Sequence, residues 1–309
     1  MNETTKNPVL FIAGPTASGK SAHAIKLAQA LNGVIINADS MQVYEDLRVL
    51  SARPSIEEEA QAPHRLYGMV EAGQNWSVAK WLEAALTEVE SCWALGQLPI
   101  LTGGTGLYFK ALEQGLAHIP DVPKEIQEEA DDILANSGIQ ELWAQLEALD
   151  NESFDRLHPN DRQRIRRSWE VARATGHPLS YWYAQGQSGL LSRGDVRLRR
   201  YAITPDRDTL YARCEKRVLH MVENGALDEV RALLNKEPGQ EKGVMKALGV
   251  PELAAFLTGD LSLDDAISLL QRNTRRYAKR QLTWFRHQAA HWEWQDTQLN
   301  VKNIIDSFS

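Results

Sequence analysis

The chain has 309 residues, of which 43% are hydrophobic and 24% are charged, and its formal net charge is −7. The composition is ordinary for a globular protein, and the length suffices for one large domain or two moderate ones. The longest apolar runs fall well short of the roughly 18 residues of a membrane helix, and the polar start is no secretory leader, so we expect a cytoplasmic protein without a membrane span. Cys92 and Cys214 lack partners at metal-ligand spacing and are expected to be ordinary thiols.

Strand-like and helix-like segments alternate through the first hundred residues. An apolar run at 9–13 leads into a glycine-rich loop, and a segment with helical period follows at 20–33. Two further apolar runs, at 34–40 and 98–104, end in small and polar residues, as parallel strands covered on both faces do. The sequence therefore predicts an α/β fold with a doubly wound parallel sheet, whose first part occupies residues 1–112.

The loop between the first strand and helix, GPTASGKS, matches the P-loop pattern that is shared with ATP-binding and other nucleotide-binding proteins. Backbone N–H groups and the helix N-terminus of such a loop bind phosphate oxygens, Lys20 adds a charge, and the Ser21 hydroxyl can ligate Mg²⁺. A chance glycine turn is the alternative, which the flanking strand and helix disfavour. The predicted phosphate site consists of Gly14, Pro15, Thr16, Ala17, Ser18, Gly19, Lys20 and Ser21.

Asp39 follows the second strand and admits three interpretations: a magnesium ligand, a general base, or the N-cap of a helix starting at Ser40. The third strand lacks the terminal acid that nucleotide-hydrolysing P-loop proteins use to hold their metal. It ends instead in TGGTG, where Thr105 stands among three glycines. That segment fits a ligand site and a tight strand-to-helix turn equally well.

Residues 113–190 read as a helical insertion, and residues 191–309 as the second part of the core. The insertion opens with an acidic stretch, nine acids against one base in residues 121–150. Its arginine-rich segment has Ile165, Trp169 and Ala172 at the spacing of a packed stripe, while the neighbouring arginines favour either a solvated face or a nucleic-acid contact. After 190 we expect a strand at 196–205 that returns to the sheet and then only helices, with a loop at 235–243.

A segment near the C-terminus is strongly basic, although the whole chain has a negative net charge. Residues 271–288 contain six Lys and Arg side chains and no acid. Five of them recur at helical spacing on one face, with Tyr277 and Trp284 expected on the other: Arg272, Arg275, Arg276, Lys279 and Arg280. A single-sided basic face without neutralising acids favours a polyanionic partner.

The chain resembles the tRNA dimethylallyltransferase family, bacterial type. The resemblance rests on motifs in sequence order: GPTASGKS, NADSMQVY, APHRLYG, TGGTGLYFKALEQGL, HPNDRQRIRRSWEV, TGHPLS, YAITPDRDTLYARCEKRV and AKRQLTWFR. It implies transfer of a dimethylallyl group from dimethylallyl diphosphate to the N6 amine of the adenosine 3′ of the anticodon in tRNA. The P-loop would then hold the diphosphate of the dimethylallyl donor, and Mg²⁺ would bind at Ser21.

The resemblance also implies roles for single residues. Asp39 would be the base, Thr16 a hydrogen-bonding group, and Arg217, supported by Arg213, a contact of the leaving diphosphate. Contacts with the tRNA anticodon stem-loop are implied for Asp39, Ser40, Met41, Gln42, Thr105, Gln163, Arg164, Ile165, Arg166, Arg167, Arg276 and Lys279. We expect the chain to act as a monomer.

Two alternatives remain at this point. A kinase for a small molecule or nucleotide would share the P-loop and an acid such as Asp39, but it would not need the basic helix. A non-catalytic RNA-binding protein with a relic P-loop would leave Lys20 and Asp39 dispensable.

Overall fold

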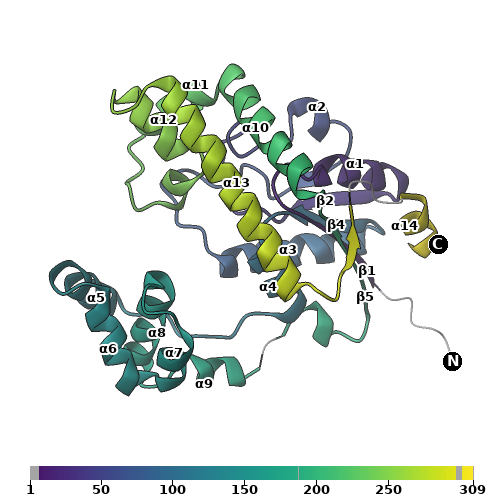
Figure 1. Ribbon diagram of the computed structural model, residues 1–309. Helices are drawn as coiled ribbons and strands as arrows, with labels where there is room; N and C mark the ends of the chain where they lie inside the picture. The colour runs from purple at the N-terminus through teal and green to yellow at the C-terminus, as the bar shows by residue number, and fades with distance from the viewer. Residues whose placement is uncertain (1–6, 187, 297–300, 309) are drawn as a thin grey trace. The chain divides into compact units, whose positions relative to one another are not determined.

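Six parallel strands form one sheet in the computed structural model, which describes residues 7–186, 188–296 and 301–308 (Figure 1). The strand order is β3-β2-β4-β1-β5-β6. The strands are β1 (Asn7–Ala13), β2 (Gly33–Asn37), β3 (His64–Arg65), β4 (Leu98–Gly103), β5 (Val196–Ile203) and β6 (Glu293–Gln295). The predicted parallel sheet is confirmed, and β5 returns to it beside β1. The expectation of helices alone after 206 is wrong at β6, a three-residue edge strand too short to show a periodic pattern.

The chain divides into two compact units, Met1–Glu113 with Arg193–Ser309, and Gln114–Ser192. The helices of the first unit are α1 (Lys20–Ala30), α2 (Ile56–Glu59), α3 (Val78–Ala94), α4 (Gly106–Gln114), α10 (Arg207–Glu223), α11 (Ala226–Asn235), η2 (Gly243–Lys246), α12 (Val250–Leu257), α13 (Leu263–Gln288) and α14 (Val301–Phe308). Those of the second unit are α5 (Lys124–Asn136), α6 (Ile139–Leu149), α7 (Asn151–Arg156), α8 (Arg162–Thr175), α9 (Leu179–Ala184) and η1 (Leu190–Ser192).

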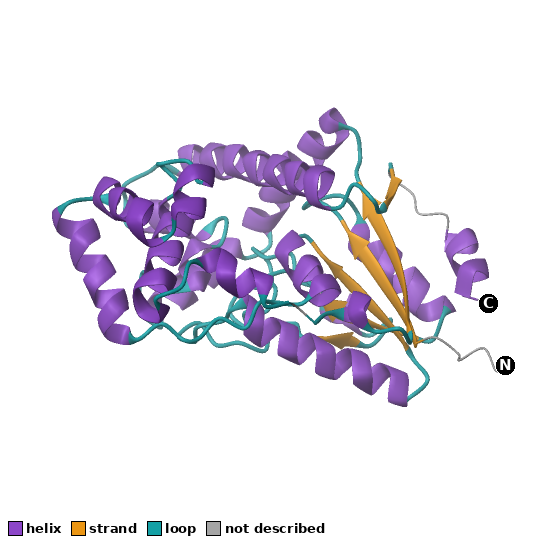
Figure 2. Ribbon diagram, turned by 90° about the horizontal axis from the view of Figure 1, so that it is seen from below, coloured by secondary structure: helices purple, strands orange, loops and turns teal. Residues whose placement is uncertain are grey.

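The sheet has helices on both faces, because the residues of its central strand alternate between two apolar layers (Figure 2). Leu10 and Ile12 of β1 lie in one buried cluster with side chains of α1 and with Ile304 of α14. Phe11 packs on the opposite side against the rings of Phe109 and Trp292. Both faces of β1 are therefore dry, which explains its continuous apolar sequence.

The second unit has a core of its own. Ile165 and Trp169 of α8 are fully buried and pack against Leu142 and Leu146 of α6. Ala172 is buried as well, so the packed stripe predicted for this segment is confirmed. None of the helices in the described parts of the chain combines the length and the apolar character that a membrane crossing requires.

Candidate active site

The P-loop joins the end of β1 to the first turn of α1. Gly19 lies in the left-handed region at φ 92°, where glycine is favoured, and α1 begins at Lys20. The Lys20 ammonium donates to the carbonyl of Pro15 (3.2 Å) and so closes the loop on itself. The Ser18 hydroxyl is 1% exposed and has no hydrogen-bond partner among the described residues. An unpaired buried hydroxyl in a loop of this geometry fits a phosphate ligand.

Two arginines of α10 reach this loop. Arg217 donates to the Thr16 hydroxyl (2.9 Å), and Arg213 lies at the Ser18 carbonyl (3.5 Å). The guanidinium groups come from residues about 200 positions away along the chain. The fold therefore brings together the three cationic and hydroxyl groups that the resemblance assigned to one ligand: Thr16, Lys20 and Arg217.

Asp39 stands two residues past β2 and opposite the P-loop. Its side chain accepts a hydrogen bond from the Met41 N–H (3.0 Å), and its own N–H donates to Asn37 (2.8 Å). This is a turn that no helix follows, since the next helix, α2, begins only at Ile56. The N-cap interpretation is therefore wrong. The carboxylate is close enough to Lys20 to favour the charged ammonium.

The turn after β4 faces the same carboxylate. Thr105 accepts a hydrogen bond from the Ser40 N–H (3.0 Å) and donates one to the Ser40 hydroxyl (3.3 Å). The Tyr277 hydroxyl of α13 lies near Thr105 as well, and burial raises the pKa of this tyrosine. β4 ends at Gly103 and α4 begins at Gly106, so the segment is a tight turn and, at the same time, a neighbour of Asp39.

A cavity of about 220 Å³ opens between these elements. Its lining combines charged, polar and apolar side chains. Its wall consists of Thr16, Lys20, Asp39, Ser40, Met41, Gln42, Leu50, Ser51, Arg217, Met221, Lys246, Ala247, Leu248, Leu270, Thr274, Tyr277 and Arg280. Burial lowers the pKa of Lys20 to about 8, against the opposing effect of Asp39. An anion in the cavity would relieve that cost, because it would favour the charged lysine.

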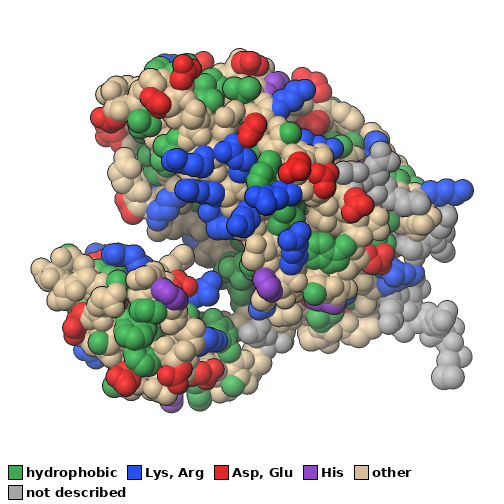
Figure 3. All heavy atoms as spheres, in the orientation of Figure 1, with side chains coloured by type: hydrophobic (Ala, Val, Ile, Leu, Met, Phe, Trp, Pro, Cys, Tyr) green, Lys and Arg blue, Asp and Glu red, His purple; other side chains and the backbone are tan. Residues whose placement is uncertain are grey.

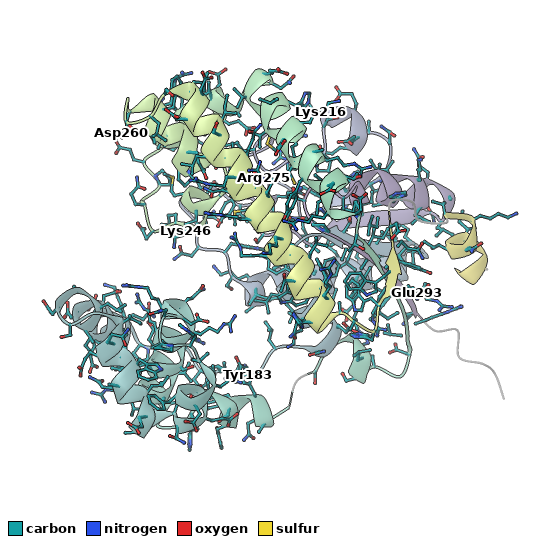
Figure 4. The ribbon with its side chains drawn as sticks, in the orientation of Figure 1. Tyr183, Lys216, Lys246, Asp260, Arg275 and Glu293 are labelled. Atoms are coloured by element: carbon teal, nitrogen blue, oxygen red, sulfur yellow. The ribbon has the colours of Figure 1, made fainter. Side chains whose placement is uncertain are left out.

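The basic face of α13 needs one correction. Arg275 forms an ion pair with Glu215 of α10 (2.6 Å), so it is not free for a polyanion. Counting charges within one helix misses a neutralising acid that another helix supplies. Lys and Arg side chains still gather along the middle of α13 in the space-filling view (Figure 3), and Figure 4 shows Arg275 on the side toward α10. Arg276 and Lys279 are exposed and form no ion pair with the described residues.

The predicted tRNA contacts in α8 divide by burial. Gln163, Arg164 and Arg167 are exposed. The Ile165 side chain is 0% exposed in the core of the second unit and cannot contact RNA, so that assignment is wrong. The same helical period that predicted its burial should have removed it from the contacts. Arg166 is occupied by ion pairs with Asp131 and Glu170.

Gln42 lines the cavity, and the backbone holds its side chain in place. Its amide nitrogen donates to the carbonyls of Ser51 (3.0 Å) and Ala52 (2.9 Å), so only its carbonyl oxygen remains for a ligand. Met41 lines the cavity and packs against a buried apolar cluster.

Sequence reasoning missed two buried or half-buried groups that shape this site. Gln281 of α13 connects the P-loop to the turn after β4. Glu229 of α11 accepts hydrogen bonds from three successive N–H groups, those of residues 48, 49 and 50 (2.6–3.0 Å), and so holds the segment that carries Leu50 and Ser51. The sequence offered no signal for either, since a polar residue in a helix is ordinarily solvated.

Comparison with known proteins identifies the family of the chain. The family model described as IPP transferase matches residues 42–288. Proteins named tRNA dimethylallyltransferase from Rhodospirillum centenum and from Rhodopseudomonas palustris strain CGA009 are 51% and 50% identical over 285 residues, 92% of this chain and 90% and 88% of those proteins.

Two solved structures extend the comparison. The tRNA isopentenylpyrophosphate transferase of Bacillus halodurans has a TM-score of 0.69 and 33% identity, covering 98% of this chain and 95% of that one. A eukaryotic dimethylallyltransferase captured acting on tRNA has a TM-score of 0.81 and 27% identity, covering 94% of this chain and 74% of that one. The chain therefore belongs to the tRNA dimethylallyltransferase family.

Proposed function

We propose that the protein transfers a dimethylallyl group from dimethylallyl diphosphate to the N6 amine of the adenosine 3′-adjacent to the anticodon in tRNA, with release of diphosphate. The observation that carries the proposal is the cavity, whose wall combines Lys20, Arg217 and Asp39 with apolar side chains. A short prenyl diphosphate requires cationic groups for its phosphates and apolar side chains for its hydrocarbon tail. The kinase alternative is set aside by family membership.

The donor would lie with its diphosphate in the P-loop. Lys20 and Arg217 supply two positive charges beside the loop, and the Ser18 hydroxyl supplies an unused donor. The hydrocarbon tail would lie against Leu50, Met221 and Leu270. Removing about five carbon atoms from water contributes about 3 to 4 kcal/mol to binding at most. That contribution favours a prenyl diphosphate over free diphosphate as the ligand of the P-loop.

The chemistry then follows from the groups at hand. The bond between the allylic carbon and the diphosphate oxygen breaks, and its electron pair stays on the oxygen. The lone pair of the N6 amine forms the new carbon–nitrogen bond, and one N6 proton passes to the Asp39 carboxylate. Lys20 and Arg217 stabilise the negative charge that grows on the leaving oxygen, in fixed positions that need little reorganisation.

We also propose that Mg²⁺ takes part, held by the Ser21 hydroxyl and the diphosphate. The described residues contain no group of three or more His, Cys, Asp or Glu side chains that could hold a metal. This fits Mg²⁺, which keeps several waters and takes few protein ligands beside substrate phosphates. When bound, the ion would neutralise part of the charge on diphosphate.

The acceptor is a base in a folded RNA, so it must leave its stack to reach Asp39. Arg276 and Lys279 of α13 would bind phosphates of tRNA, as would the exposed Arg164 and Arg167 of α8. We also propose that the protein acts as a monomer. Because its acceptor is tRNA, we propose a cytoplasmic location.

The deciding experiment incubates the purified protein with dimethylallyl diphosphate, labelled in the dimethylallyl group, and unmodified tRNA. Label should appear in the adenosine beside the anticodon after nuclease digestion. Transcripts with guanosine at that position should stay unlabelled. Failure to label tRNA, or ATP turnover without RNA, would refute the proposal.

A further inference from the structure

One buried amide connects the two loops that frame the cavity. Gln281, 6% exposed on α13, accepts a hydrogen bond from the Thr16 N–H through Oε1 (2.8 Å). Its Nε2 donates to the carbonyl of Gly104 (2.9 Å). An N–H can only donate and a carbonyl can only accept, so the amide fits in one orientation alone. Both ends of the side chain are used.

The space around this amide is closed. A Cβ atom at Gly104 would lie 2.1 Å from Nε2 of Gln281 and 3.3 Å from the carbonyl oxygen of Gly14. Gly104 does not have a positive φ, so a larger residue there would be opposed by the amide of Gln281, which it would displace. The turn after β4, the P-loop and Gln281 therefore fit as one unit.

Each of the two loops that Gln281 connects carries a threonine whose hydroxyl lies close to a group with a proposed role in the reaction. Thr16 accepts from Arg217 (2.9 Å), the arginine expected at the leaving diphosphate. Thr105, next to Gly104, is hydrogen-bonded to Ser40 beside Asp39. The strands that lead into these loops, β1 and β4, are neighbours in the sheet. Gln281 does not line the cavity itself, so it acts on the reaction through the two loops.

We propose that Gln281 is a positioning residue that fixes the P-loop, on the donor side, relative to the turn after β4, on the acceptor side. The inference rests on the function proposed above. The link occupies the Thr16 N–H, so the backbone donors left for diphosphate belong to later residues of the P-loop. Without the link, the positions of Thr16 and Arg217 relative to Thr105 and Asp39 are no longer fixed. Correct register matters most when the reacting atoms are in contact, so turnover should suffer more than tRNA binding.

The first test compares three variants. Gln281→Met keeps the length of the side chain but makes neither hydrogen bond, and kcat should fall by about 10- to 100-fold. Its tRNA affinity should stay within about threefold of wild type, since no phosphate contact is removed. Gln271→Met is the matched control, because Gln271 lies on the same helix and also donates to a main-chain carbonyl, that of Glu215 (3.4 Å). Its kcat should stay near wild type.

Gln281→Glu separates positioning from mere folding. A protonated glutamic acid can accept from Thr16 and donate to Gly104 as glutamine does, whereas the carboxylate repels the Gly104 carbonyl. Its kcat relative to wild type should therefore rise as pH falls from 8 to 6, by at most about tenfold per pH unit. A residue needed only for stability would change the unfolding midpoint and leave this ratio flat. Circular dichroism confirms that each variant is folded.

A double-mutant cycle tests the same link from its other end. Gly104→Ala should displace the amide and lower kcat on its own, but should cost little more in the Gln281→Met background. Binding of inorganic diphosphate, measured by calorimetry, should weaken by about tenfold in both single variants whether or not tRNA is modified. Additive effects, or a kcat for Gln281→Met within twofold of wild type, would overturn the inference. Absence of transfer by the wild-type protein with a normal diphosphate response would count against the proposed function instead.

Discussion

Replacing Lys20 by methionine should stabilise the protein while it removes activity. Burial lowers the pKa of this lysine from 10.5 to about 8. The folded state therefore holds the charged form at a cost of about 3 kcal/mol relative to the unfolded chain. Methionine keeps the length and has no charge to desolvate. Methionine cannot make the hydrogen bond to the Pro15 carbonyl, and the loss of that bond offsets about 1 kcal/mol of the gain. The free energy of unfolding should therefore rise by about 2 kcal/mol at pH 7.

The sign of the pH dependence follows from the same values. Below pH 8 the lysine is charged in both the folded and unfolded states, and the whole cost is present. Between pH 8 and 10.5 the folded state releases its proton first, so the cost shrinks as pH rises. The advantage of Lys20→Met should therefore fall by about 2 kcal/mol between pH 7 and pH 9.5.

Urea unfolding at these two pH values measures the effect. Lys26→Met is the matched control, because Lys26 is exposed on the same helix, and it should change stability little at either pH. Turnover of Lys20→Met should fall by about 10²- to 10³-fold through loss of a charge at the leaving group. A variant that is less stable than wild type at pH 7, or whose advantage does not depend on pH, would refute the reasoning.

Three further predictions concern the cavity and α13. Asp39→Asn should slow a single turnover by about 10²- to 10⁴-fold if the carboxylate is the base; recovery with excess magnesium would instead identify a metal ligand, and near-normal chemistry would exclude both roles. Arg276→Ala and Lys279→Ala should each lower the slope of log tRNA affinity against log salt by about 0.7 to 0.9, whereas Arg275→Ala, whose side chain is paired in the protein, should lower it less. An equal slope for all three would mean that this face does not bind phosphate. Glu229→Ala should lower the free energy of unfolding by about 2 to 4 kcal/mol, because three backbone N–H groups lose a charged acceptor, and unchanged urea unfolding would contradict this.

The parts of the fold that the sequence predicted are those with a strong local pattern. Strands β1, β2 and β4 are buried on both faces, so each appears as an unbroken apolar run. Strands β3 and β6 have two and three residues at the sheet edges and show no such run. Their pairing depends on neighbouring strands, which lie far away in the sequence.

The site divides in the same way. The P-loop is a consecutive motif, and its residues could be assigned from eight letters. Gln281 acts on Thr16 across 265 positions, and a glutamine in an amphipathic helix gives no hint of a buried partner. Arg275 was misjudged for the same reason, because its acid partner lies on another helix.

The arrangement of α13 explains how one helix can serve both of its proposed roles, tRNA binding and lining of the cavity. Successive residues point about 100° apart, so neighbours in sequence face different surroundings. Ala278 and Leu282 pack beneath the P-loop with Ala17. Tyr277 and Arg280 line the cavity, while Arg276 and Lys279 remain at the surface. Substitutions of Arg276 and Lys279 should therefore change tRNA affinity and its salt dependence. Substitutions of their neighbours Tyr277 and Arg280 should change turnover. The helix fixes the distance between the proposed RNA-binding face and the cavity, so we expect tRNA bound on that face to present its adenosine at a defined depth.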